Sequence, residues 1–366
     1  MAASLKVFFN QHVVESLAKE FSQAHGPFDS KTFAKECLLG LDSLELMARA
    51  WHIAEAFRRH LPQDFRQASK VILRTLPADP AFQRMDVFRY LPHVFYVSKY
   101  GIEHFEESME VQRELTKHFT AEFSIRPFIE KYPEQSHDRL CRWAKDPNMH
   151  VRRLVSEGSR PPLPWAPRLR AYQKDPSPVL VLLELLKDDP ELYVRRSVAN
   201  SLNDIAKDHP EIAVRVCREW MKDATPERKW IINHALRSLV KAGNPGALAV
   251  MGVGAAPKIE VTAARFTPKV VKLGGKLQFA FDVASATKKT QTLQVDYRVH
   301  LVKANGKASP KVFKLRRLEL KAGQSVTLSS TVSFAPMTTR KSYPGVHHFE
   351  ALVNGVGFPL GSVRLQ

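Results

Sequence analysis

The chain has 366 residues, of which 44% are hydrophobic and 25% charged, so it can build two globular domains and is not a disordered protein. It carries 55 Lys and Arg against 37 Asp and Glu, a net charge of +18, which favours a polyanionic partner such as nucleic acid. Three widely spaced cysteines exclude a disulfide framework and the usual zinc and iron–sulfur motifs, so we expect a cytoplasmic protein without a metal or other cofactor.

The N-terminal two thirds of the chain have the pattern of helices. Residues 1–21 lack a sustained apolar core and predict an amphipathic helix rather than a signal peptide. Up to about residue 250, apolar residues recur at helical spacing between proline-containing breaks, as in 41–62, 65–77 and 178–190. No stretch approaches the length of a membrane span, so we expect a helical domain over 1–257 without membrane contact.

An internal repeat indicates the class of this helical domain. Residues 146–159 (DPNMHVRRLVSEGS) align with 189–202 (DPELYVRRSVANSL), an offset of 43 residues, and a weaker copy occupies 223–239. A helical period of 40–47 residues is typical of HEAT-like solenoids, whose concave face is commonly the binding surface. Arg152 and Arg195, with Asp146 and Asp189, fit the structural ladder of such repeats better than contacts with DNA.

The helical periodicity predicts a polar row on the two clear repeats. At 100° per residue, Val151, Leu154 and Val155 form a core stripe, and Val194, Val198 and Leu202 form the equivalent stripe one repeat later. The polar side chains that point away from these stripes are Arg153, Glu157, Arg196, Asn200, Asn203 and Asp204. Carboxylates repel phosphates, so their presence on a DNA-binding surface indicates a positively charged ligand. An exposed acid on a helix is, however, more often simply solvated.

The loop over residues 158–170 (GSRPPLPWAPRLR) is rich in proline around Trp165. Proline fixes φ and removes backbone donors, so this loop is stiff. A stiff loop can hold the indole of Trp165 against a flat group such as a base or a sugar. Ordinary packing of Trp165 between repeats is an equally open interpretation.

The pattern changes to alternation from about residue 258. Apolar residues alternate over 277–283, 293–301 and 326–334, and turns occur at 274–275, 305–306 and 354–355. Seven or eight such strands predict an Ig-like sandwich over 258–366, with 243–258 as the linker. We therefore expect a mainly α protein, a HEAT-like α-solenoid followed by an all-β Ig-like domain.

Most of the basic excess lies in this second domain. Residues 258–366 contain 18 Lys and Arg against 5 Asp and Glu, a net charge of +13. The clustered cations are Lys311, Lys314, Arg316, Arg317 and Lys321 on one strand and its turn, with basic pairs at 288–289 and 340–341 in other loops. Charged edge strands also prevent aggregation, but the scarcity of acids favours phosphate contacts.

Three segments carry a family resemblance. EFSIRPFIEKYP (122–133), VRRLVSEGSRPPLPWAPRL (151–169) and VRRSVANSLNDIAKDHP (194–210) closely resemble the AlkC family of DNA glycosylases, within the AlkC/AlkD superfamily of HEAT-like repeat enzymes. The SEGSRPPLPW run is the specific part, whereas the repeat itself is not. A C-terminal Ig-like domain also occurs in one subgroup of that family.

The resemblance implies a base-excision-repair enzyme that removes positively charged alkylated bases, chiefly 3-methyladenine and also 3-methylcytosine, without full base flipping. It also implies a monomer that acts on double-stranded DNA containing such bases. The catalytic residues would be Glu122, Glu157, Asp204 and Trp165, and Glu122 rests on the resemblance alone. The residues expected to bind DNA are Arg153, Arg160, Arg196, Asn200, Asn203, Lys314, Arg316 and Arg317.

The chemistry suits these groups, because an alkylated base is already a cationic leaving group. Fixed carboxylates can stabilise the oxocarbenium-like sugar and position the attacking water, and Trp165 can stack on the base or the sugar. A non-enzymatic HEAT-repeat protein that binds damaged or bent nucleic acid is the alternative, since fold alone does not separate the two.

Overall fold

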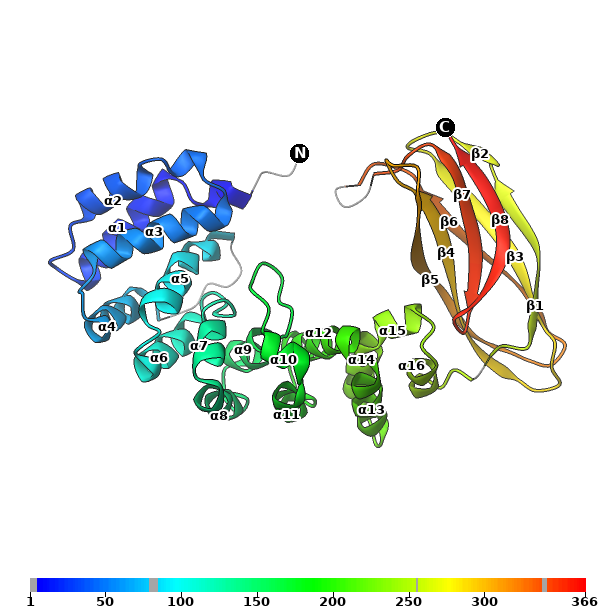
Figure 1. Ribbon diagram of the computed structural model, residues 1–366, viewed down its shortest axis with the longest axis horizontal. Helices are drawn as coiled ribbons and strands as arrows, with labels where there is room; N and C mark the ends of the chain where they lie inside the picture. The colour runs from blue at the N-terminus through cyan, green and yellow to red at the C-terminus, as the bar shows by residue number, and fades with distance from the viewer. Residues whose placement is uncertain (1–4, 79–84, 255, 338–340) are drawn as a thin grey trace. The chain divides into compact units, whose positions relative to one another are not determined.

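The computed structural model describes residues 5–78, 85–254, 256–337 and 341–366 (Figure 1). The chain divides into two compact units, Met1–Asp208 and His209–Gln366. The helices after Asp208 thus group with the strands by packing, whereas the sequence places the domain boundary at 257/258. That boundary stays a prediction, although the change from helices to strands does fall between Val250 and Ile259.

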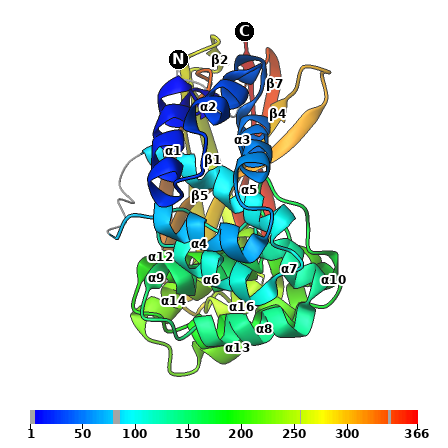
Figure 2. The same cartoon turned by 90° about the vertical axis from the view of Figure 1, so that its left-hand side faces the viewer.

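The first unit is built from helices (Figure 2). In chain order, the described helices are η1 (Leu5–Phe8), α1 (Gln11–Ala24), α2 (Ser30–Leu38), η2 (Leu41–Ser43), α3 (Leu46–His60), α4 (Phe65–Thr75), η3 (Met85–Tyr90), α5 (Leu91–Tyr100), α6 (Phe105–Leu115), α7 (Ile125–Lys131), α8 (Pro133–Trp143), α9 (Met149–Gly158), α10 (Arg170–Lys174), α11 (Ser177–Leu186) and α12 (Leu192–Asp208). The described part of this unit has no helix with the length and apolar character of a membrane span.

Local sequence signals explain where these helices begin. The side chains of Asn10, Asp29 and Asp64 accept hydrogen bonds from backbone N–H groups at the starts of α1, α2 and α4, which satisfies donors that have no partner inside the helix. The helices predicted within 41–62, 65–77 and 178–190 are confirmed as α3, α4 and α11. The amphipathic N-terminal helix begins only at Gln11, because the Asn10 cap separates it from η1.

The repeat predicted from the sequence is present. Helix α9 packs beside α12, and α11 contacts α8, α9 and α12. The Asp–Arg ladder is confirmed: the Arg152 guanidinium donates to both carboxylate oxygens of Asp189, at 2.6 and 3.1 Å. Arg113 Nε donates to Asp146 Oδ2 at 2.7 Å, which extends the ladder one repeat toward the N-terminus. These arginines therefore tie neighbouring repeats together.

The second unit begins with four described helices and continues as strands. The elements are α13 (Pro210–Met221), α14 (Pro226–Ala235), α15 (Arg237–Lys241), α16 (Pro245–Val250), β1 (Ile259–Thr267), β2 (Val270–Val271), β3 (Lys276–Ser285), β4 (Gln291–Val302), β5 (Ala308–Leu320), β6 (Ser325–Ser333), β7 (Gly345–Val353) and β8 (Val356–Leu365).

The predicted linker over 243–258 is wrong in its first half. Asn244 caps α16 by accepting from the backbone N–H of Ala247, and Ala247 and Leu248 are buried. At Gly243, an added Cβ would lie 2.8 Å from Gly355 Cα in the β7–β8 turn, so the backbone passes close to the sandwich. The segment is a packed connection rather than a free tether.

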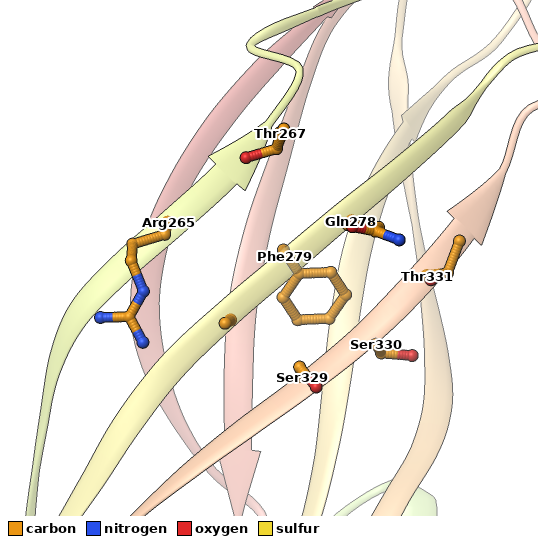
Figure 3. Close-up of a pocket in the computed structure, with 8 residues that line it drawn as sticks. Arg265, Thr267, Gln278, Phe279, Ser329, Ser330 and Thr331 are labelled. Carbon is orange, nitrogen blue, oxygen red and sulfur yellow. The ribbon is translucent and has the colours of Figure 1, made fainter.

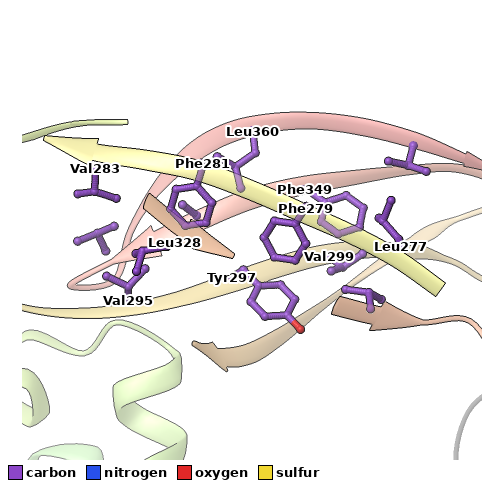
Figure 4. Close-up of a cluster of buried hydrophobic side chains, with 14 of the residues drawn as sticks. Leu277, Phe279, Phe281, Val283, Val295, Tyr297, Val299, Leu328, Phe349 and Leu360 are labelled. Atoms are coloured by element: carbon purple, nitrogen blue, oxygen red, sulfur yellow. The ribbon is translucent and has the colours of Figure 1, made fainter. Parts of the chain in front are cut away.

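The strands form a sandwich of two sheets, ordered β1-β3-β6 and β2-β8-β7-β4-β5. The alternating apolar residues predicted in β3 and β4 all point into the core, where the ring of Phe279 meets that of Tyr297 at 4.9 Å (Figure 4). At the predicted 354–355 turn, Asn354 and Gly355 both have positive φ (49° and 81°), as a tight hairpin between β7 and β8 requires. The Ig-like architecture is therefore confirmed.

The three-stranded sheet also carries a cavity of about 540 Å³, lined by polar side chains that include Arg265, Gln278 and Thr331 (Figure 3). None of the residues predicted to be catalytic or to bind DNA lines it.

Candidate active site

The structure brings the three predicted carboxylates into one row of ion pairs. Glu122 lies in the turn before α7, Glu157 near the end of α9 and Asp204 in α12. Arg153 joins Glu122 to Glu157, with Nη1 3.0 Å from Glu122 Oε2 and Nη2 3.5 Å from Glu157 Oε1. Arg160 joins Glu157 to Asp204, with nitrogens 2.6 Å from an oxygen of each. We call Glu122, Arg153, Glu157, Arg160 and Asp204 the ionic row.

The carboxylates of the row are not exposed, which corrects the expectation of a solvated polar face. Glu157 is 7% exposed and Asp204 is 4% exposed. The helical wheel turns both away from the apolar stripe, but α9 and α12 pack side by side, so the two groups lie between repeats. Arg160, at the start of the proline-rich loop, caps them further.

Glu157 is held as an anion in spite of its burial. Burial alone raises the pKa of a carboxyl, but Arg153, Arg160 and a hydrogen bond from Ser197 outweigh it and lower the pKa of Glu157 below its ordinary value. Ser197 Oγ donates to Glu157 Oε2 at 2.7 Å, and Ser156 Oγ lies 2.7 Å from Ser197 Oγ. The structure therefore fixes both the charge and the orientation of this carboxylate.

The two arginines of the row are also charged. Burial opposes the charge of Arg160, but Glu157 and Asp204 raise its pKa above the ordinary value. Burial likewise opposes the charge of Arg153, but Glu157 and Glu122 raise its pKa above the ordinary value. Arg153 also lies over the ring of Tyr193, 5.2 Å from its centroid. Both arginines were predicted to bind DNA, yet in the free protein each is engaged by carboxylates.

Asp204 has a second cationic partner that is much more exposed than Arg160. Lys207 Nζ lies 2.6 Å from Asp204 Oδ1, and the Lys207 side chain is 57% exposed whereas that of Arg160 is 12% exposed. Of the other residues predicted on α12, Arg196 is exposed, Asn200 is half-buried and Asn203 is buried. Only Arg196 among these three presents an open side chain.

Trp165 lies in the loop between α9 and α10, and its side chain is largely exposed rather than packed. Its φ is +66° and it is 65% exposed, so packing between repeats is not its role. A bulky residue in the left-handed region is a strained exception that persists only where its surroundings enforce it.

Arg126 enforces this loop conformation, and sequence reasoning missed it. Its guanidinium is almost completely buried and donates five hydrogen bonds of 2.6–3.1 Å to the carbonyls of Gly158, Arg160, Pro161 and Pro167. Burial lowers the pKa of Arg126 to about 10, which leaves it charged at neutral pH. The only sequence signal is an arginine among apolar residues of a short helix, and this signal does not name its partner.

The basic strand of the sandwich is divided between two faces. A bulge at Leu315 of β5, opposite Val295 and Asp296, shifts the β4–β5 register, so that Lys314 pairs with Asp296, Arg317 with Gln294 and Arg316 with Val295. Since Val295 points into the core and its neighbours in β4 point outward, Arg316 lies on the opposite face from Lys314 and Arg317. All three side chains are exposed on this edge strand.

Lys314 and Arg317 line a cavity of about 360 Å³ together with Arg237, Lys241 and Asp296. Arg317 Nη2 also donates to the carbonyl of Met251 at 2.8 Å. Of the basic pair predicted at 340–341, Arg340 lies outside the described residues.

The comparisons with known proteins agree with this architecture. Residues 260–366 match the family model of the C-terminal Ig-like domain of the uncharacterised protein YhaZ. The chain is 34% identical to the uncharacterised protein YhaZ of Bacillus subtilis (strain 168) over 96% of its own length and 97% of that protein. It is also similar to the alkylpurine DNA glycosylase AlkC of Pseudomonas fluorescens, solved bound to DNA containing an abasic site analog, with 37% identity, a TM-score of 0.88 and complete coverage of both chains.

A HEAT-like repeat domain with an appended Ig-like domain places the chain in the class of AlkC-type glycosylase folds. The chain belongs to the AlkC family.

Proposed function

We propose that this protein is a DNA glycosylase of base excision repair that hydrolyses the N-glycosidic bond of positively charged alkylated bases. The observation that carries the proposal is the pair of buried carboxylates, Glu157 and Asp204, held by one arginine of the loop that displays Trp165. The similarity to an alkylpurine DNA glycosylase over the whole chain supports it. We include 3-methyladenine and 3-methylcytosine among the substrates and double-stranded DNA as the partner of a monomer.

The reaction needs little acid catalysis from the protein, because the alkylated base is already a cationic leaving group. As the bond between C1′ and the base breaks, its electron pair moves to the cationic base, which leaves neutral, and positive charge develops on the sugar. Glu157 and Asp204 stabilise this charge, and one of them accepts a proton from the water that adds to C1′. Glu122 is a third anion at the far end of the ionic row, and Trp165 stacks on the base or the sugar. A base cleaved in this way need not be fully flipped from the duplex.

The charge of the ionic row must change before it can favour a cation. In the free protein the three carboxylates are balanced by Arg153, Arg160 and Lys207. Lys207 is the exposed member of this set, so a DNA phosphate can draw it away from Asp204 at the least cost. We propose that this exchange leaves Asp204 with excess negative charge only when DNA is bound.

The remaining contacts that we propose with DNA come from both domains, taken as 1–257 and 258–366. On the helix that carries Asp204, the contact comes from the exposed Arg196 and the half-buried Asn200, whereas the predicted Asn203 is buried; Lys314, Arg316 and Arg317 lie on the edge strand β5. Cations on the sandwich suit the phosphates of the duplex outside the lesion. Such a protein acts in the cytoplasm, at the bacterial nucleoid.

A non-enzymatic protein that binds damaged DNA is the second candidate, and the full pairing of the ionic row in the free protein favours it. The two candidates differ in one measurement, the release of free base from duplex DNA that contains 3-methyladenine, followed by chromatography. We expect release by the wild type and loss of release in Glu157→Gln. Binding of the lesion duplex without any release by the wild type would establish the second candidate.

A further inference from the structure

A cleft with aromatic walls lies beside the loop that carries Trp165. It is formed by α3, α5, α7 and the loop, has a volume of about 230 Å³, and contains none of the carboxylates of the ionic row. Its principal walls are Met47, Trp51, Phe95, Phe123, Pro127 and Trp165. All of these belong to the first unit.

The inner aromatic side chains of the cleft pack against one another. Trp51 and Phe95 are stacked, with ring centroids 4.4 Å apart and 11° between the planes, and Phe95 is only 4% exposed. Phe123 meets Phe95 at 6.3 Å and 72°, and Lys99 Nζ lies 6.0 Å from the centroid of the Trp51 ring. The indole of Trp165, which is 65% exposed, is therefore the open flat surface on which a planar heteroaromatic group can stack.

Few polar groups in the cleft are free to meet a ligand. The guanidinium of Arg126 is committed to the carbonyls of the loop, and Ser98 Oγ donates to the carbonyl of Phe95. Glu130, by contrast, is exposed and lines the cleft. An occupant should therefore be planar and largely apolar, with an N–H group that a carboxylate can accept.

Trp165 connects this cleft to the ionic row. The same short loop carries Arg160, which bridges Glu157 and Asp204, and Trp165, whose strained backbone holds the indole at the cleft. The ionic row and the cleft therefore share one loop.

We propose that the cleft binds the free alkylated base after its release from DNA. This inference rests on the proposed function. Cleavage turns a cationic base into a neutral one, which suits an apolar aromatic cleft better than a row of carboxylates. 3-Methyladenine and 3-methylcytosine share a flat ring and an exocyclic amino group, and Glu130 accepts a hydrogen bond from that group.

The test is equilibrium dialysis of the full-length protein with free 3-methyladenine. We expect one base per chain for the wild type, and binding weaker by about fivefold to a hundredfold in Trp165→Ala, the range that removal of one base–aromatic stack gives. Ser98→Phe should abolish binding by filling the cleft, and the exposed change Glu130→Gln should weaken it without affecting folding. Leu39→Ala is the matched control, because Leu39 is an exposed apolar residue of the same unit outside the cleft.

Two outcomes would overturn the inference and leave the proposed function standing: no binding by a wild type that does release base from DNA, or unchanged binding in a folded Ser98→Phe and in Glu130→Gln. Conversely, Glu157→Gln should lose excision yet bind the free base as the wild type does.

A second arm identifies the source of the base. Uncleaved lesion duplex is added to Glu157→Gln with the free base present. Binding of the free base should persist. Its displacement by lesion duplex, but not by undamaged duplex, would overturn the assignment to the released product and show that the cleft takes the base while it is still attached.

Discussion

The two units carry their charge in opposite ways. In the first unit, the two arginines of the ionic row are largely buried against carboxylates at 2.6–3.5 Å, and together with Lys207 they balance its three carboxylates. In the sandwich, a net charge of +13 over 258–366 is displayed largely on exposed side chains such as those of β5. Buried pairs act over short distances and are little affected by salt, whereas exposed charges act over longer distances and are screened. We therefore expect the first unit to carry out the chemistry and the sandwich of the second unit to supply most of the attraction to DNA.

Replacing Asp204 should abolish base excision without lowering the affinity for duplex DNA. Asp204→Asn keeps the size of the side chain but removes the charge that stabilises the developing sugar cation, so we expect a loss of excision of about 10²–10³-fold or more. Arg160 and Lys207 lose a partner and become available to phosphates, so duplex affinity should stay the same or rise slightly. Single-turnover base release and duplex titration measure the two effects.

The control for this variant is Asp208→Asn, an exposed acid on the same helix. A loss of binding in Asp204→Asn as large as its loss of rate would instead make Asp204 a structural residue.

Removing the sandwich should have the opposite signature. A chain that ends after Ala256 should keep folded helical repeats but lose DNA affinity and most activity. The slope of log affinity against log salt should fall by about 0.9 for each DNA phosphate that the truncated protein no longer neutralises. Because Gly243 and the Met251 carbonyl contact the sandwich, thermal unfolding must be measured beside the salt titration. An unchanged slope and rate would reduce the Ig-like domain to a passive appendage.

The bulge in β5 allows a finer division of the same effect. Arg316→Ser changes one face of the sheet and the double variant Lys314→Ser with Arg317→Ser changes the other. If one face meets DNA, only one of these variants should lower the salt slope, by about 0.9 or 1.8. Equal reductions per residue from both would mean that the edge strand itself, rather than either face, lies along the backbone.

The architecture could be predicted from the sequence because it depends on periodicity. Alternation in β3 and β4 and the 43-residue repeat each follow from side chains that must point to a core. The helical wheel also turned Glu157 and Asp204 toward the same side. It could not give their burial, which depends on how closely α9 and α12 pack.

Other features of the site depend on contacts that no local pattern records. Arg126 binds carbonyls 32 to 41 residues away, so its role in holding Trp165 is invisible in the sequence. The two faces of β5 depend on a bulge, which inverts the alternation after Leu315. The helix α16 was missed because residues 243–258 were interpreted as a linker, although Asn244 and Pro245 can cap and begin a helix.

The smallest expected effect concerns acid, and it tests whether the ionic row is as tightly paired as the distances indicate. Burial raises the pKa of Glu157, but Arg153, Arg160 and Ser197 together lower it below the ordinary value of 4.5. A carboxyl whose pKa is lowered in the folded state stabilises the fold fully at any pH above its unfolded-state pKa. This contribution is lost as the pH falls through the folded-state pKa.

We expect Glu157→Gln to lower the free energy of unfolding by about 1.5–3 kcal/mol at pH 7, the usual contribution of hydrogen bonds to a charged group. The gap between wild type and variant should remain constant down to about pH 5 and then narrow below pH 4.5. Urea unfolding at a series of pH values measures the gap, with the exposed Glu130→Gln as a control that should show almost none. A gap that stayed constant at acid pH would mean that Glu157 stabilises the fold by packing rather than by charge. The proposal that these carboxylates stabilise the sugar cation would then lose its basis.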